Sequence, residues 1–308
     1  MIIGLIDVDG HKFPNLPLMK ISAWHKRNRE NVTWFSPLWN SHWARVYMAK
    51  VFSFTPDYSY PINASEIIMG GSGYHIRLQD GKEVWQSEND YILPRDIEHI
   101  YPDYSLYGIT DQAFGFLSRG CPRQCMFCHV KSKEGTQAHK VANLDEFWRG
   151  QKKITIMDPN ILAVPQASDL LQQLADSKSW VDINQGLDAR LLTEEKIEII
   201  RKIKMKRYHF AWDNPKDENK ILPKLKQFSE MIKVDRHNTL VYCLVNYNST
   251  LEEDLYRVYK LKSLNMQPYV MIYDKKHADP IYKNLQRYVN SPMIFWSVNS
   301  FSEYKGGK

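Results

Sequence analysis

Short apolar runs alternate with longer amphipathic stretches along the second half of the chain. Six runs have the length and the β-branched or aromatic content of buried strands, at 113–117, 154–157, 181–184, 208–212, 240–245 and 269–273. Stretches with helical spacing lie between them, as at 193–203 and 251–261. Because two parallel strands need a crossover between them, this alternation predicts a parallel sheet with helices packed against it.

The first hundred residues show a shorter version of the same pattern. Apolar runs at 2–8, 32–35, 45–54 and 66–69 and a helical stretch around 18–24 predict a small α/β layer of the doubly wound kind. Residues 81–111 contain prolines, tyrosines and polar residues without a clear period, which is typical of a crossing between domains. We therefore expect two domains, at 1–106 and 107–308.

Polar residues follow each apolar run of the second half where the strand is expected to end. They are Asp158 after the second run, Gln185, Asp188 and Arg190 after the third, Asp213 after the fourth, Asn246 after the fifth, and Asp274 after the sixth. Parallel strands bring their carboxyl ends to one edge, so these side chains and the cysteine-containing stretch that follows the first run should surround a single mouth. Asp and Asn are also favoured there as caps and turn residues, and Arg190 could equally form a structural pair with Asp188.

Composition indicates a soluble, cytoplasmic protein. The chain has 308 residues, of which 43% are hydrophobic, enough for a sizeable core. It has four cysteines, which do not make a disulfide framework, and neither a signal peptide nor an apolar run of about 20 residues is present. The net charge of +6 is spread along the chain, so it permits a nucleic-acid partner but supports one only weakly.

Three cysteines lie together in one short stretch, Cys121, Cys125 and Cys128, with the spacing C-x3-C-x2-C. Gly120 and a following proline favour a loop that folds back on itself and brings the thiols together. Three thiolates suit a 4Fe-4S cluster that is held through three of its irons and leaves the fourth open. A zinc site of the Cys3His type, completed by a nearby histidine at 129 or 139, is the alternative. Cys243 lies within an apolar run and is expected to be a core thiol.

With Phe127 included, the cysteine stretch resembles the radical S-adenosylmethionine (radical SAM) signature, C-x3-C-x-aromatic-C. The resemblance implies a partial (β/α)6 barrel over the second domain and S-adenosylmethionine bound to the open iron. It implies reductive cleavage to a 5′-deoxyadenosyl radical that abstracts hydrogen from an unknown substrate, with an electron donor such as flavodoxin or ferredoxin. It further implies that cofactor contacts come from Phe127, Asp158, Gln185, Asp188, Arg190 and Asn246. We expect Asp213 and Tyr273 to meet the substrate or relay a proton.

The first domain resembles the cobalamin-binding-type domain that precedes many radical SAM cores. Its first strand and the glycine cluster at 70–73 match the landmarks of that domain, whereas Pro14 replaces the glycine of the D-x-H-x-x-G pattern that begins at Asp9 and contains His11. Bound cobalamin would imply methyl transfer, and its absence would imply hydrogen abstraction followed by oxidation or rearrangement. With only Cys243 outside the loop, a second cluster is not expected. The alternative from another class is a zinc-binding, non-catalytic protein that binds nucleic acid.

Overall fold

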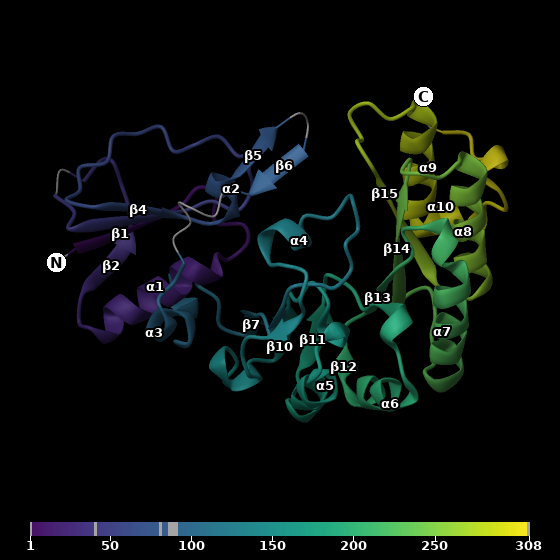
Figure 1. Cartoon of the computed structure of the whole chain (residues 1–308), viewed down its shortest axis with the longest axis horizontal. Coiled ribbons are helices and arrows are strands. Elements are labelled where there is room, and N and C mark those ends of the chain that lie inside the picture. The colour runs from purple at the N-terminus through teal and green to yellow at the C-terminus, as the bar shows by residue number, and fades with distance from the viewer. Residues whose placement is uncertain (1, 40–41, 80–81, 86–91, 307–308) are drawn as a thin grey trace. The chain divides into compact units, whose positions relative to one another are not determined.

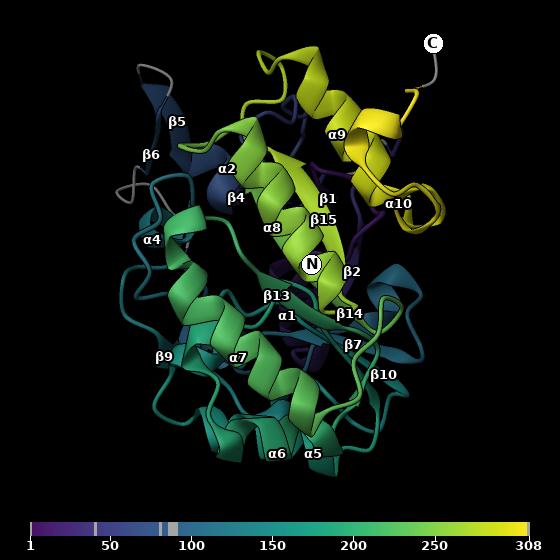
Figure 2. The ribbon, with the colours of Figure 1, turned by 90° about the vertical axis from the view of Figure 1, so that its right-hand side faces the viewer.

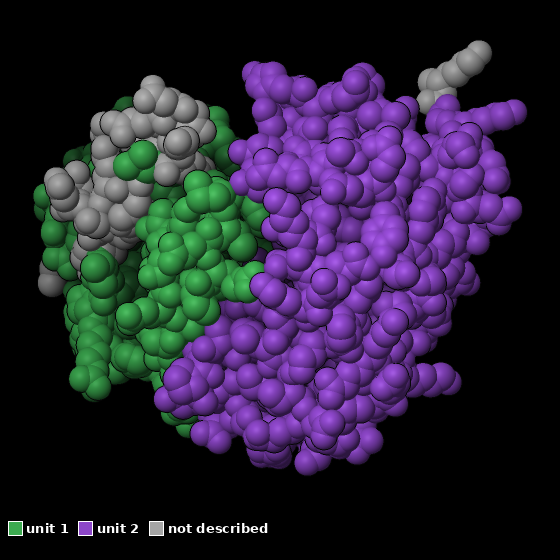
Figure 3. Space-filling view, turned by 45° about the vertical axis from the view of Figure 1, so that its right-hand side comes forward, with its two compact units in different colours: residues 1–154 green, residues 155–308 purple. Residues whose placement is uncertain are grey.

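The computed structural model describes residues 2–39, 42–79, 82–85 and 92–306, and it shows a mixed α/β chain with parallel sheets (Figure 1). The chain divides into two compact units, Met1–Ile154 and Thr155–Lys308 (Figure 3). This division falls later than the boundary expected near residue 107. That boundary stays a prediction about folding domains, and each unit is described below by itself.

Unit 1 is built on a parallel four-stranded sheet. Its order is β2 (Asn31–Trp34), β1 (Ile2–Asp7), β3 (Arg45–Ala49) and β4 (Ile67–Gly70), with every neighbouring pair parallel. Helix α1 (Leu16–Arg27) begins at an N-cap, Asn15, whose side chain accepts from the Leu18 N–H at 3.2 Å. The helix packs its apolar side on one face of the sheet. This helix forms one of the two helical layers, one on each face of the sheet, that a doubly wound domain would have.

Among the described residues, the opposite face of this sheet is covered by one short helix, α2 (Ser72–His75), which contributes Tyr74, and otherwise by irregular segments. Ile6 and Met48 pack there against Trp43 and are covered by irregular segments that contribute Phe35 and Tyr58. The crossover from β3 to β4, residues 50–66, is described throughout and contains no helix, because its prolines and aromatic residues do not follow a helical period. A helix of several turns covers one face of the sheet and only a single helical turn lies on the other among the described residues, so the doubly wound arrangement stays a prediction.

The remainder of unit 1 consists of short elements. They are α2 (Ser72–His75), the antiparallel pair β5 (Ile76–Gln79) and β6 (Lys82–Trp85), α3 (Arg95–Glu98), the 3₁₀ turn η2 (Tyr104–Tyr107), β7 (Gln112–Gly115), the antiparallel pair β8 (Ser118–Arg119) and β9 (His139–Lys140), α4 (Val130–Lys133) and η3 (Leu144–Glu146). Several of them fall in the stretch that was expected to be an irregular crossing.

Unit 2 is a run of strands and helices in alternation. Strand β10 (Lys153–Ile156) enters it and neighbours β11 (Trp180–Ile183), which pairs in parallel with β12 (Lys204–Met205). Strands β13 (Tyr208–Ala211), β14 (Thr239–Val245) and β15 (Gln267–Ile272) form a parallel sheet in that order. A parallel bridge between Leu187 and Phe210 connects the end of β11 to β13. All six strands predicted from the sequence are therefore present, within about two residues of the expected bounds.

Helices cover the outside of these strands, as the alternation predicts. They are α5 (Ala167–Asp176), α6 (Glu194–Lys202), α7 (Glu218–Met231), α8 (Leu251–Ser263), α9 (Pro280–Asn290) and α10 (Pro292–Ser297), with 3₁₀ turns η4 (Ile161–Ala163), η5 (Ala189–Leu191), η6 (Pro215–Asp217) and η7 (Phe301–Glu303). Figure 2 shows α8 lying over β14 and β15. Helix α8 begins with a capping box, in which Thr250 and Glu253 each accept a hydrogen bond from the other's backbone N–H.

None of the described helices has the length and apolar character that crossing a membrane would require.

Candidate functional site

The cysteine loop of unit 1 is closed at its base by the two-residue ladder of β8 and β9. Glu134 reinforces this closure because its carboxylate accepts from the Arg119 guanidinium at 2.8 Å and from the Gly120 N–H at 3.1 Å. Gly120 has a φ of +76°, and a Cβ at this position would collide with the backbone carbonyl of Gln137. Both the left-handed conformation and the close approach require glycine here, so the prediction of a folded-back loop is confirmed.

The backbone also holds the cysteines within this closed loop. The Cys121 N–H donates to the Gly135 carbonyl at 3.3 Å, and the Cys128 N–H donates to the Cys125 carbonyl at 3.1 Å. Cys121 is buried, and Cys125 and Cys128 are half-buried. Among the residues that the structure describes, no three histidine, cysteine or acidic side chains are arranged as a metal site. The loop thus provides three thiols on a constrained backbone, and the convergence of their sulfurs on one cluster stays a prediction.

The two histidines considered for a zinc site lie in the same loop. His129 is exposed and occupies the N-cap of α4, directly after the last cysteine. His139 is exposed on β9, with its Nδ1 3.1 Å from the Gln137 carbonyl. Phe127, the aromatic residue of the motif, is half-buried between Cys125 and Cys128.

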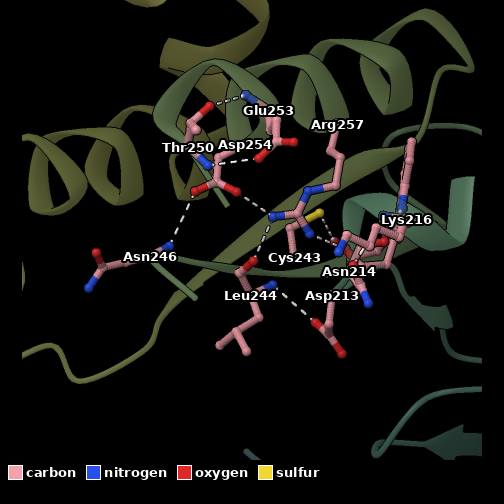
Figure 4. Close-up of polar contacts among 12 residues, drawn as sticks. Asp213, Asn214, Lys216, Cys243, Leu244, Asn246, Thr250, Glu253, Asp254 and Arg257 are labelled. Atoms are coloured by element: carbon pink, nitrogen blue, oxygen red, sulfur yellow. Dashed lines mark hydrogen bonds and ion pairs between the residues drawn. The ribbon is translucent and has the colours of Figure 1, made fainter. Parts of the chain in front are cut away.

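The carboxyl ends of β13, β14 and β15 bring three of the expected site residues onto neighbouring strands of unit 2. Asp213 accepts from the Leu244 N–H at 3.0 Å, so its carboxylate crosses from the end of β13 to β14 (Figure 4). The Asn246 side-chain amide donates to the Tyr273 carbonyl at 3.1 Å, which joins the ends of β14 and β15. Asn246 has a φ of +61°, a left-handed turn conformation that asparagine tolerates. The predicted gathering of polar groups at one edge is confirmed for these three strands.

A fully buried ion pair beneath this edge was not predicted from the sequence. Arg257 and Asp254, both on α8, have side chains that are 0% exposed. The Arg257 guanidinium donates to Asp254, to the Trp212 carbonyl, and to the Leu244 carbonyl at 2.7 Å, while Asp254 also accepts from the Asn246 N–H at 3.2 Å (Figure 4). One helix thereby ties together the ends of β13 and β14. The only sequence signal was an Asp and an Arg three residues apart, a spacing that usually indicates an exposed pair.

Burial sets the electrostatics of this edge. It raises the pKa of Asp213, and the Leu244 N–H and the Arg257 guanidinium partly offset that rise. It also raises the pKa of Cys243 to about 12, so this thiol stays protonated in the core of β14, as predicted. Asp213 is thus a carboxyl group held closer to neutrality than an exposed aspartate.

The residues that follow β11 are mainly paired with each other. Arg190 donates to Asp188 at 2.6 Å and to Asp217 at 2.8 Å, and Asp188 also accepts from the Arg190 backbone N–H as the N-cap of η5. The Asn160 amide lies 3.4 Å from the second oxygen of Asp188. Gln185 is exposed and donates to the neighbouring Asn184 side chain at 3.2 Å. The structural pairing considered for Asp188 and Arg190 is therefore present.

Asp158, the residue expected to hold the amine of S-adenosylmethionine, is 0% exposed just beyond β10. It belongs to unit 2, as do the polar residues after the later strands, whereas the cysteine loop belongs to unit 1. A single mouth that contains both groups stays a prediction.

The residues of unit 1 do not fit a bound cobalamin. The glycines after β4 face their own chain, because a Cβ at Gly71 or Gly73 would collide with the backbone of residues 50–52. The chain's own backbone therefore leaves no space directly beside these two glycines. His11, the residue considered as a cobalt ligand, is exposed and stacks on Trp34 with ring centroids 4.0 Å apart. The cobalamin prediction gains no support from these described residues.

The chain is a mixed α/β protein with a three-cysteine loop, and comparisons with known proteins add a limited likeness. No protein-family model and no curated protein sequence matches it. SuiB of Streptococcus suis bound to precursor peptide SuiA is 13% identical, with 61% of this chain and 47% of SuiB covered and a TM-score of 0.44. SuiB bound to S-adenosylmethionine is 14% identical, with 61% and 46% covered and a TM-score of 0.43. The match spans about half the length of SuiB, and TM-scores of this size assign neither family nor activity.

Proposed function

We propose that this protein is a radical SAM enzyme, an oxidoreductase or transferase that carries a single 4Fe-4S cluster. The observation that carries the proposal is the C-x3-C-x-aromatic-C spacing of Cys121, Cys125, Phe127 and Cys128. These residues lie in a loop whose two ends are held together by the β8–β9 pair and by backbone hydrogen bonds. Three thiolates in one loop suit a cluster with one open iron, and four protein ligands would be expected for a closed structural cluster. The donor set therefore fits the group.

Cys121, Cys125 and Cys128 would hold the cluster. When bound, the cluster supplies the electron that cleaves S-adenosylmethionine to a 5′-deoxyadenosyl radical, and the substrate loses a hydrogen atom to that radical. The burial of Cys121 and the half-burial of the other two thiols limit the access of water to the site. In this proposal Phe127, Asp158, Gln185, Asp188, Arg190 and Asn246 contribute contacts to S-adenosylmethionine.

Asp213 and Tyr273 are the proposed groups that meet the substrate. The Oδ1 atom of Asp213 is used by the Leu244 N–H, so Oδ2 is the atom that can accept or release a proton. Because its pKa is raised, a larger fraction of Asp213 is protonated near neutral pH than of an exposed aspartate. Tyr273 is 43% exposed at the end of β15 and can present its ring or hydroxyl to a ligand.

The test is anaerobic reconstitution with iron and sulfide, followed by metal analysis, a visible spectrum and an assay for 5′-deoxyadenosine with dithionite as reductant. We expect about four irons per chain and formation of 5′-deoxyadenosine. The Cys125→Ala variant should lose the cleavage activity, and the Cys243→Ala variant should retain it because Cys243 lies in the core of unit 2. A colourless protein that holds one zinc ion, or cleavage that persists in Cys125→Ala, would refute the proposal.

The physiological partners follow from the same chemistry. A flavodoxin or ferredoxin would replace dithionite as the electron donor, and the substrate is the molecule whose hydrogen is abstracted. Methyl transfer through cobalamin does not enter the proposal, because the chain itself fills the space beside Gly71 and Gly73. Addition of cobalamin to the reconstituted protein should leave its visible spectrum equal to the sum of the two components.

A further inference from the structure

Unit 1 contains a pocket of about 300 Å³ at the carboxyl edge of its sheet, outside the cysteine loop. The ends of β1 and β2 form its floor, and residues 56–60 of the irregular crossover form its opposite wall. Its lining residues are Leu5, Ile6, Asp7, Val8, His11, Trp34, Phe35, Pro56, Asp57, Tyr58, Ser59 and Tyr60. Ligands commonly bind beyond the carboxyl ends of parallel strands, and this volume lies at the small end of the range for ligand pockets.

The walls of the pocket are aromatic and its charged side chains are acidic. Trp34, Phe35, Tyr58 and Tyr60 line it, and Asp7 and Asp57 are its carboxylates. Of the described residues that line it, none is lysine or arginine. His11 is the basic side chain that lines it, and it stacks on one face of Trp34 and interacts favourably with Asp7. Aromatic faces and carboxylates both attract positive charge, since the ring face carries the negative part of the quadrupole.

Asp7 is positioned to receive a cation. The Tyr107 hydroxyl donates to its Oδ2 at 2.7 Å, and the Asp9 backbone N–H also binds this carboxylate. A carboxylate offers about four acceptor positions, so Asp7 is held in place and can still accept from a ligand. Burial raises the pKa of Asp7, and the hydrogen bond from Tyr107 partly opposes this rise. A positive ligand would compensate the desolvation of this carboxylate, as paired charges do in partly buried sites.

The loop after β1 is unsuited to a phosphate. Dinucleotide-binding sheets of this kind offer backbone N–H groups to an anion at this edge. Here the Asp9 carboxylate accepts from the N–H groups of Val51 and Phe52 and from the hydroxyl of Thr55. Three donors at this edge, from the segment that follows β3, are thereby occupied by the protein's own carboxylate, which disfavours an anionic ligand.

We propose that this pocket binds a small organic cation, an amine that is protonated at neutral pH, with its ammonium group on Asp7 and its apolar body among Trp34, Phe35 and Tyr58. The ammonium group donates to the carboxylate, and the body displaces water from the aromatic walls. Asp57 lies at the mouth with a side chain that is 62% exposed and adds a longer-range attraction. The Lys50 ammonium, 4.0 Å from Asp57, weakens that contribution, so Asp7 is the principal recognition group.

The test uses three probes that share a phenyl ring and differ in charge: 2-phenylethylamine, 2-phenylethanol and phenylacetate. Binding to the full chain is measured by isothermal titration calorimetry and by saturation-transfer NMR. The amine should bind at least about tenfold more tightly than the alcohol, as one charged hydrogen bond implies, and phenylacetate should bind most weakly. Equal affinities for the three probes, tighter binding of phenylacetate or no binding of the amine would overturn the proposal.

The Asp7→Asn variant should lose at least about tenfold in affinity for the amine and should bind the alcohol as before. Asp145→Asn removes the same charge from an exposed position of unit 1 outside the pocket and should leave both affinities unchanged. An Asp7→Asn variant that binds the amine as tightly as the parent chain would contradict the proposal. The probe series needs no variant, so it decides the matter even if Asp7→Asn does not fold. None of these readouts depends on the cluster, so the cysteine-loop proposal can fail independently.

Discussion

The buried pair of Asp254 and Arg257 should be among the costliest positions to change in unit 2. In Asp254→Asn the guanidinium of Arg257 stays at 0% exposure without its counter-ion, and the Asn246 N–H loses a charged acceptor. Two hydrogen bonds to a charged group contribute about 3–6 kcal/mol. Breaking a buried ion pair on one side costs about 3–5 kcal/mol by a separate comparison. We therefore expect the free energy of unfolding to fall by about 3–5 kcal/mol, a large part of the stability of an ordinary domain.

Urea unfolding followed by circular dichroism measures this loss. Because the chain has two compact units, the transition that moves is fitted separately from the other. The matched control is Glu252→Gln, which removes one negative charge from the same turn of α8 at an exposed position and should lower the midpoint far less than Asp254→Asn does. In the double variant Asp254→Leu with Arg257→Met, both charges are gone and most of the loss should be recovered. A loss below about 1 kcal/mol in Asp254→Asn would refute the view that this pair holds the strand ends.

Three further outcomes follow from the structure. Gly120→Ala should lower the free energy of unfolding by more than about 1 kcal/mol and should also lower the iron content after reconstitution. The control Gly150→Ala has a φ of +90° but no atom within 4 Å of the added Cβ, so it should keep its iron content, and equal iron contents in the two variants would contradict the close approach at Gly120. Iodoacetamide should spare Cys243 in the native chain, as counted by mass spectrometry, and modify it only in denaturant, because its thiol is buried and its pKa is about 12. Asp213→Asn should be more stable than the parent chain at pH 7, because the raised pKa of Asp213 in the folded chain means that its ionisation destabilises the fold. This gain should disappear as the pH falls below the ordinary aspartate pKa, and a stability difference that is constant across pH would show that Asp213 is not desolvated.

The sequence predicts the strands of unit 2 well because buried parallel strands are continuous apolar runs bounded by polar residues. Strand β3 shows where this signal fails. The apolar run continues to Phe54, but the strand ends at Ala49, because the Asp9 carboxylate accepts from the N–H groups of Val51 and Phe52 and draws the chain out of the sheet. Helix α3 is a single turn, too short to show a period. A contact between distant residues decides the end of β3, and the shortness of the element decides the case of α3.

Some residues of the candidate site can also be predicted from the sequence, and others cannot. The cysteine loop is predictable because its three cysteines lie within eight residues and its turn requires Gly120. The Asp254 and Arg257 pair is not, because charged residues on a helix are usually exposed and their burial depends on carbonyls from two strands. The aromatic pocket was also missed, since aromatic residues in sequence are more often core than ligand walls.

The hydrogen bonds at the strand ends indicate which of the expected site residues are best placed to bind a ligand. Asp188 uses both the backbone and the side chain of Arg190, and Arg190 also binds Asp217, so their charges largely satisfy one another. Asp213 uses one carboxylate oxygen for the Leu244 N–H, and Asn246 uses its amide nitrogen for the Tyr273 carbonyl. Each of these two side chains keeps an oxygen for a ligand, while the same hydrogen bonds hold it in place (Figure 4). Ligand contacts at this edge should therefore come first from the ends of β13 and β14, with Asp188 and Arg190 supporting the loop after β11.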